Sequence, residues 1–344
     1  MASLVLNGDT SGSITVSAPS VAGSNTVSLP ANTGTAILDY STPAYRNRII
    51  NGAMGIWQRG TTFSSPASGA YTADRFFIVW SGAAPTVSQT TGPTGYKYAL
   101  QITGAVGNTL TSLYQRIESV NCSDLSGATV TIQVNLQVST AQTVTWVLYY
   151  PTATDNYASA TLISNGSWSA TTTAGVYTAT ITNLPSGVTN GLQLIIGANN
   201  NGAFTSGTLN ITGVQLEKGS TATSFDYRPY GTELALCQRY YARMTASDAF
   251  ETLAIGQVGS ATAVVIYAKL PVSMRAQPTI NYSTLRLDDG SVTPAVTSLG
   301  TNRSGVDNIS QTFNASGGGM TLGRAGMLEA NNSTSAYIDA TAEL

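Results

Sequence analysis

Residues 129–138 read Thr-Val-Thr-Ile-Gln-Val-Asn-Leu-Gln-Val, and this stretch decides the fold class of the chain. Polar and apolar side chains alternate without a break over its ten positions. Successive side chains of a β-strand point to opposite faces of a sheet, so strict alternation predicts a strand with one buried and one polar face.

Similar strand signals recur along the middle of the chain, at residues 143–150, 176–181, 192–196 and 209–216. Clusters of turn-forming residues separate them, for example Asn165-Gly166-Ser167 and Pro185-Ser186-Gly187. Many strands at short spacing, with no helical pattern between them, predict an antiparallel β-sandwich.

The length of 344 residues is too great for one ordinary sandwich. We predict an all-β chain in four parts. These are an N-terminal β-arm over residues 1–45, a β-sandwich over 46–230, a short linking helix over 231–244 and a second β-sandwich over 245–344.

The two ends of the chain carry weaker strand signals. In the arm, residues 13–17 and 25–29 alternate and are separated by Gly and Pro. In the C-terminal part, strands are expected at residues 261–270, 281–287 and 335–344. The helix is predicted from Thr232 as its cap and Glu233 in its first turn, with arginines near its end.

Composition excludes several classes of function. Charged residues make up 9% of the chain and the net charge is -2, so no basic field exists to bind nucleic acid. The chain has no histidine, which removes the commonest general base and metal ligand. We therefore expect no cofactor, no metal and no catalysis, and we expect Cys122 and Cys237 to be buried free thiols.

The segment that begins the sequence lacks a basic region followed by a sustained apolar run, so it does not resemble a secretory signal. No stretch has the length needed to cross a bilayer. We expect synthesis in a cytoplasm and no membrane insertion.

Several segments resemble bacteriophage tail fibre and virion fibre proteins. They are Asn47-Arg48-Ile49-Ile50-Asn51-Gly52-Ala53-Met54-Gly55-Ile56-Trp57-Gln58-Arg59-Gly60, Tyr71-Thr72-Ala73-Asp74-Arg75-Phe76, Gly213-Val214-Gln215-Leu216-Glu217-Lys218-Gly219, Phe225-Asp226-Tyr227-Arg228-Pro229-Tyr230, Leu236-Cys237-Gln238-Arg239-Tyr240-Tyr241 and Leu270-Pro271-Val272-Ser273-Met274-Arg275-Ala276-Gln277-Pro278. The middle part is also similar to jelly-roll carbohydrate-binding modules, in which an opening Asn-Gly-x-Met segment pairs with a closing strand like residues 210–216.

The resemblance implies a jelly roll over residues 46–230, a place in the virion and a homotrimer. It further implies that residues 1–45 anchor the chain to other virion proteins and that the chain takes part in host attachment. Alternatives remain open: a capsid-decorating fibre or cement protein without a receptor role, a glycan-binding module, or a polysaccharide depolymerase.

Two sets of residues are candidates for contacts. Charges are scarce, so those beside aromatic residues are expected to pair at a subunit interface or domain junction: Trp57, Arg59, Asp74, Arg75, Phe225, Asp226, Tyr227 and Arg228. A glycan platform could be formed by aromatic faces, and we assign it to Trp168, Tyr149 and Tyr177.

Overall fold

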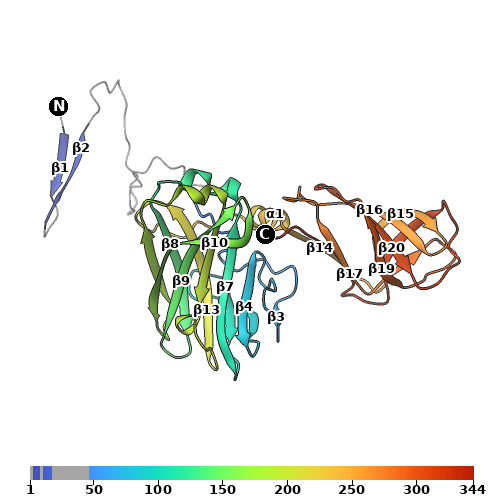
Figure 1. Cartoon of the computed structure of the whole chain (residues 1–344), viewed down its shortest axis with the longest axis horizontal. Coiled ribbons are helices and arrows are strands. Elements are labelled where there is room, and N and C mark those ends of the chain that lie inside the picture. The colour runs from blue at the N-terminus through green and yellow to red at the C-terminus, as the bar shows by residue number, and fades with distance from the viewer. Residues whose placement is uncertain (1–2, 8–10, 18–45) are drawn as a thin grey trace. The chain divides into compact units, whose positions relative to one another are not determined.

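The structure, a computed structural model, describes residues 3–7, 11–17 and 46–344. Two compact units are present, Met1–Thr42 and Pro43–Leu344. Nearly all regular structure in the described residues is strand, with one α-helix and four short 3-10 helices, so the all-β prediction is confirmed (Figure 1).

The first unit contains a two-stranded antiparallel ribbon of β1 (Ser3–Asn7) and β2 (Ser13–Ser17). The strand predicted at residues 13–17 is therefore present, and its partner is the segment just before it. The strand predicted at residues 25–29 lies outside the described residues. The anchoring role of residues 1–45 stays a prediction.

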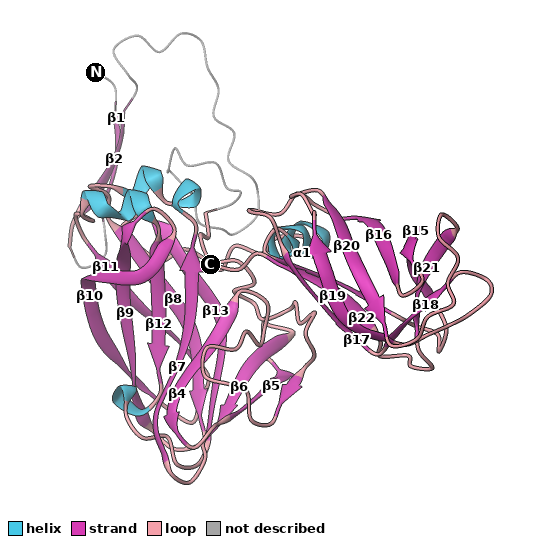
Figure 2. Ribbon diagram, turned by 45° about the vertical axis from the view of Figure 1, so that its right-hand side comes forward, coloured by secondary structure: helices cyan, strands magenta, loops and turns pink. Residues whose placement is uncertain are grey.

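A jelly roll of two antiparallel sheets opens the second unit (Figure 2). The five-stranded sheet has the order β10 (Asn156–Ala170), β9 (Gln142–Ala153), β12 (Leu192–Gly197), β7 (Asn108–Ile117) and β4 (Phe76–Gly82). The six-stranded sheet has the order β11 (Gly175–Ile181), β8 (Val130–Val138), β13 (Thr208–Lys218), β6 (Tyr98–Thr103), β5 (Thr86–Thr91) and β3 (Thr62–Phe63). The 3-10 helices of the connections are η1 (Ser119–Asn121), η2 (Ser123–Leu125), η3 (Ser186–Asn190) and η4 (Asn199–Asn201).

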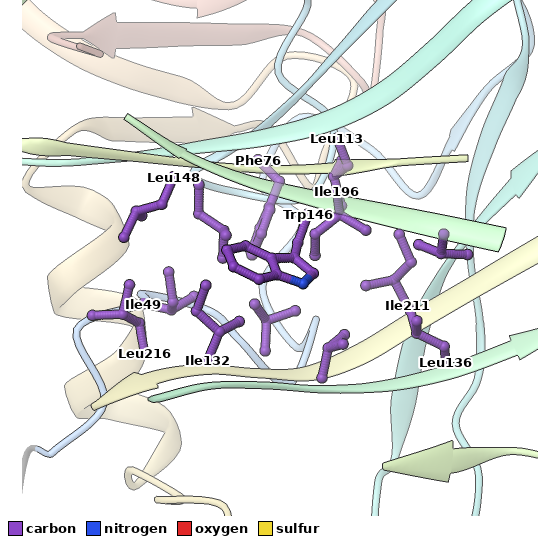
Figure 3. Close-up of a cluster of buried hydrophobic side chains, with 14 of the residues drawn as sticks. Ile49, Phe76, Leu113, Ile132, Leu136, Trp146, Leu148, Ile196, Ile211 and Leu216 are labelled. Carbon is purple, nitrogen blue, oxygen red and sulfur yellow. The ribbon is translucent and has the colours of Figure 1, made fainter. Parts of the chain in front are cut away.

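The core lies between these two sheets (Figure 3). The apolar residues of the 129–138 stretch all face it, and none is more than 2% exposed. Trp146 packs among aliphatic side chains, with its ring centroid 6.2 Å from that of Trp168. Burial of such large side chains is the main stabilising contribution to a sandwich of this kind.

The turn predicted at Asn165-Gly166-Ser167 is wrong, because β10 runs through all three residues and pairs them with β9. Gly166 lies opposite Trp146, and a Cβ atom on it would come within 2.8 Å of the indole. The glycine therefore makes room for a core side chain and does not mark a chain reversal.

The linking helix is shorter than predicted, since α1 spans Tyr230–Gln238 and not residues 231–244. It ends because Tyr241 starts β14, which pairs with the strand of residues 337–341. Thr232 is not the cap: Pro229 holds that position and no side chain caps the helix.

The remaining strands form a second sandwich, as predicted. Its three-stranded sheet has the order β14 (Tyr241–Thr245), β22 (Tyr337–Thr341) and β17 (Thr279–Ser283). Its six-stranded sheet has the order β18 (Leu285–Asp288), β21 (Ala325–Ala330), β15 (Thr252–Ser260), β16 (Ala263–Lys269), β20 (Asn308–Ala315) and β19 (Val296–Asn302). The single strand expected at residues 281–287 is divided at Thr284, whose φ is 55°.

Within the described residues, no helix combines the length and apolarity that crossing a membrane would need.

Candidate functional site

A buried cluster of charges joins the jelly roll to the residues that follow α1 and to Glu343, just after β22. We call it the junction cluster: Arg59, Asp74, Arg75, Tyr240 and Glu343. Arg75 is at its centre, with a side chain only 1% exposed. Its guanidinium pairs with Glu343, lies 3.5 Å from the centre of the Tyr240 ring and donates to the Arg116 carbonyl over 2.8 Å. A charge this deeply buried is tolerated because a carboxylate, a carbonyl and a ring face compensate it, although the Nε atom of Arg75 has no hydrogen-bond partner among the described residues.

Arg59 extends the same cluster. Its Nη2 lies 3.0 Å from Glu343 Oε1, and its Cζ lies 3.4 Å from the centre of the Tyr241 ring. Its Nη1 lies 3.7 Å from Asp74, within ion-pair range but beyond a hydrogen bond. Burial raises the pKa of Asp74 above its usual value, and it outweighs the opposing effects of Arg59 and of the hydrogen bonds from Gln58.

Glu118 makes a second connection across the same junction. Its carboxylate accepts hydrogen bonds from the Arg239 guanidinium at 3.0 to 3.2 Å and from the Tyr240 hydroxyl at 2.9 Å. Burial raises the pKa of Tyr240 to about 12, so the hydroxyl stays protonated and donates. Ion pairs therefore connect the jelly roll to the rest of the chain at two points, through Glu118 with Arg239 and through Glu343 with Arg59 and Arg75.

Residues 225–228 lie elsewhere, beside the segment that precedes the first strand of the jelly roll. Arg228 donates to the Asn47 and Ile49 carbonyls and pairs with Glu233 at 3.2 Å. Asp226 accepts the Asn47 N–H over 3.3 Å. The rings of Phe225 and Tyr227 are 4.8 Å apart. The predicted contact residues thus fall into two groups. Arg59, Asp74 and Arg75 belong to the junction cluster, and Trp57 lies with residues 225–228.

The three residues assigned to a glycan platform do not lie together. Trp168 is 6% exposed, and its indole N–H donates to the Thr178 carbonyl over 3.0 Å. Its assignment to the platform is wrong, because a ring packed between the sheets cannot stack on a sugar. Tyr177 is on β11 in the six-stranded sheet, whereas Tyr149 is on β9 in the five-stranded sheet.

Tyr149 points outward from the five-stranded sheet, beside a hollow of about 320 Å³. Asn165, Asn200 and Asn201 also line this outer-face hollow. The side-chain amides of Asn165 and Asn200 make no hydrogen bond to any described residue, and both residues are exposed. No charged residue lines the hollow; its full lining is Thr145, Trp146, Val147, Tyr149, Asn165, Gly166, Ser167, Asn200 and Asn201.

An aromatic row on the same sheet leads toward Tyr149. Ring centroids are 5.2 Å apart for Tyr71 and Phe77, and 5.0 Å apart for Phe77 and Tyr114. Burial raises the pKa of Tyr114, and the neighbouring Tyr149 adds to the effect. Phe77 is buried and Arg116 lies over its ring, so the row supports the sheet and only the half-buried Tyr149 presents a ring beside the hollow. This ring and the neutral amides are the two kinds of group that a sugar requires.

Sequence reasoning missed the asparagines of the hollow. Residues 199–201 have φ values of 44°, 58° and 55°, a left-handed conformation that asparagine tolerates better than most residues. The run Asn199-Asn200-Asn201-Gly202 was the signal available, because three asparagines before a glycine indicate a tight turn with exposed amides.

A larger pocket, of about 430 Å³, lies near residues 225–233. We call it the aromatic pocket, because its walls include five rings: Trp57, Tyr98, Phe225, Tyr227 and Tyr230. The loop of Gly52 to Gly55 forms another wall, and Gln89, Lys97 and Glu233 contribute polar groups. Four residues of its lining were predicted from the sequence as contact residues, namely Trp57, Phe225, Tyr227 and Arg228, but the cavity itself was not predicted.

The carboxylates of the jelly roll are engaged by the protein itself. Besides Asp74, Glu118 and Asp226, the carboxylate of Asp155 accepts from Ser119 at 2.7 and 2.9 Å, and that of Glu217 accepts from Thr223 at 2.7 Å. Each of these five carboxylates therefore has a partner within the protein. None of them lines the outer-face hollow or the pocket near residues 225–233, so no two of them face each other across either cavity.

No protein-family model matches the chain, and neither does any curated protein. Similar solved structures include the carbohydrate-binding module CBM4, at 16% identity and a TM-score of 0.34, covering 49% of this chain and 98% of that one. TmCBM61, solved with β-1,4-galactotriose, has 10% identity and a TM-score of 0.33, covering 51% and 100%. The active domain of tailspike protein 4 of bacteriophage CBA120 has 13% identity and a TM-score of 0.36, covering 52% and 22%.

Proposed function

We propose that this protein is a structural and attachment subunit of a bacteriophage fibre or spike, and that its jelly roll binds a neutral glycan of the host surface. The observation that carries the binding role is the outer-face hollow. It places Tyr149 beside three asparagines, with no charged group in its lining.

The physical chemistry of the hollow suits a neutral sugar. A pyranose has one face of C–H groups that packs on an aromatic ring, and hydroxyls that need both donors and acceptors. An amide side chain supplies both kinds of group. Asn165 and Asn200 are available for this because no described residue is bonded to their amides.

The place in the virion rests on the resemblance of the segments around Asn51, Asp74, Arg228 and Arg239 to phage fibre proteins. The junction cluster supports it, because a projecting fibre needs domains that are held firmly to each other. The separate ribbon of β1 and β2 supports it as well, since two strands alone are marginal in water and gain stability from a partner.

Glycan-array binding of the full chain tests the attachment role. We expect a hit among neutral glycans, and we expect Tyr149→Ala to weaken it at least tenfold. Tyr267→Ala is the matched control, since this tyrosine is 60% exposed on the other sandwich. A blank array together with no binding to host cells would remove the attachment role and leave the structural one.

The structural role has tests of its own. Light scattering should give the mass of a trimer, and gold-labelled antibody should mark particles at a fibre or spike. A clean monomer at micromolar concentration would contradict the trimer. Label on the capsid surface would instead favour the capsid-decorating alternative.

A further inference from the structure

The aromatic pocket is built as a preformed cavity. Arg228 holds one of its edges by donating to two backbone carbonyls. The Asn51 side chain holds the loop by donating to the Ile56 carbonyl and accepting the Ile56 N–H, both over 2.9 Å. Gly52 lies so close to the neighbouring strand that a Cβ atom would be 2.1 Å from the Val214 carbonyl oxygen. A site held in this way loses little entropy when it binds a ligand.

Two of its five rings are exposed, and the other three are half-buried. Tyr230 is 67% exposed and Tyr227 is 55% exposed. The indole N–H of Trp57 is already donated to the Met54 carbonyl over 2.8 Å, so this ring offers only its apolar surface. Grouped aromatic surface at the mouth of a cavity is typical of a ligand site.

The charges of the pocket are unbalanced. Three charged residues line it, and two of them, Arg228 and Glu233, are paired with each other. The third, Lys97, makes no ion pair with any described residue, and its Nζ lies 5.0 Å from the centre of the Tyr98 ring. The lining of the cavity therefore presents one positive charge without an ion-pair partner among the described residues, beside grouped rings, in a chain that has only 15 basic residues.

We propose that the aromatic pocket binds a sugar residue that carries a carboxylate, of the uronic acid or sialic acid type, from a surface polysaccharide. The C–H face of the pyranose packs on the tyrosine and tryptophan rings, and the carboxylate lies at Lys97. Gln89 and Thr61 are the neutral partners for hydroxyl groups. This site is separate from the outer-face hollow, which has no charge and takes a neutral sugar.

Calorimetric titration of the full chain tests the proposal, with Trp fluorescence as a second readout because Trp57 lines the pocket. The probes are a galacturonic acid oligomer, an N-acetylneuraminic acid oligomer and a neutral galactose oligomer. We expect one acidic oligomer to bind and to bind more weakly as salt is added, and the comparison of the two acidic oligomers identifies its type.

Variants locate the site. Lys97→Gln should weaken acidic binding about fivefold while Lys97→Arg keeps it, because an exposed ion pair contributes modestly and depends on charge. Tyr230→Ala should weaken it about tenfold. Lys269→Gln and Tyr267→Ala are the matched controls, an exposed lysine and an exposed tyrosine on the second sandwich.

Three results would overturn the proposal: no heat and no fluorescence change with either acidic oligomer at millimolar concentration, equal binding of the neutral oligomer, or binding unaffected by both Lys97→Gln and Tyr230→Ala. Tyr149→Ala separates this proposal from the neutral-glycan site. It should leave acidic binding intact even if the array result fails.

Discussion

The junction cluster and the aromatic pocket use the same residue types in opposite ways. In the junction cluster, Arg75 lies over Tyr240 and both side chains are buried. In the aromatic pocket, Tyr230 is 67% exposed and Lys97 has no ion-pair partner among the described residues. The difference shows that a cation beside a ring supports the fold when both are enclosed. In the pocket the cation is exposed beside the half-buried Tyr98 ring, and this is why we propose a ligand for it.

Removal of Arg75 should have the largest effect on stability. Arg75→Ala leaves Glu343 buried with Arg59 as its remaining partner, so we expect a cost near the lower end of the about 3–5 kcal/mol that loss of one partner of a buried pair causes. Urea unfolding followed by fluorescence measures this loss in the free energy of unfolding. A loss below 1 kcal/mol, on the order of an exposed pair, would show that solvent reaches the junction and that its charges are not enclosed.

The loop of the aromatic pocket should respond to a single methyl group. Gly52→Ala forces a Cβ atom against the Val214 carbonyl, and we expect it to lower the free energy of unfolding by about 1–3 kcal/mol. Gly55→Ala is the matched control, because a Cβ there meets nothing within 4 Å. Equal effects of the two substitutions would contradict the close packing of this wall.

The pH dependence of stability should carry a signature of Asp74. Its folded-state pKa is raised, so over the pH range between its unfolded and folded pKa values the folded protein binds more protons than the unfolded chain. The contribution of Asp74 to the free energy of unfolding is therefore present at low pH. It falls as the pH rises above about 4, the ordinary pKa of an aspartate side chain. Unfolding of the protein and of Asp74→Asn at several pH values should give curves that diverge in this direction, and parallel curves would contradict it.

The smallest effect on stability is expected at the exposed ring of Tyr230 and at the half-buried ring of Tyr149, which lies on the outer face of its sheet. Tyr230→Ala and Tyr149→Ala should each change the free energy of unfolding by less than about 0.5 kcal/mol, as is usual for surface positions. The same urea unfolding measures both. A large loss at either position would mean that the ring supports the fold, and its role in binding would have to be reconsidered.

Much of the fold was predictable because alternation is a local property of the chain. Residues 129–138 form β8 almost as predicted, with their apolar side chains inward. The turn at Asn165-Gly166 was predicted wrongly because a glycine that accommodates Trp146 has the same sequence signature as a turn. The end of α1 was also missed, since pairing of β14 with β22 outweighs the helical preference of residues 239–244.

The sites were less predictable because their parts are distant in sequence. Arg59 and Arg75 were identified as paired charges, but Glu343 lies 284 and 268 positions away from them, and no local pattern connects them. The platform failed for a different reason, because closeness in sequence does not place two side chains on one face. Tyr149 and Tyr177 are close in sequence but lie on different sheets, and Trp168 alternates into the core.

The pairing of Arg75 with Glu343 also orders events during synthesis. A ribosome completes the last strand of the jelly roll long before Glu343 is made, by on the order of ten seconds at ordinary rates of translation. During that interval Arg75 has neither its carboxylate nor Tyr240 fully in place, and the newly made jelly roll carries an uncompensated charge. The junction therefore acts as a late step of maturation, and it couples the final stability of the first sandwich to successful synthesis of the second.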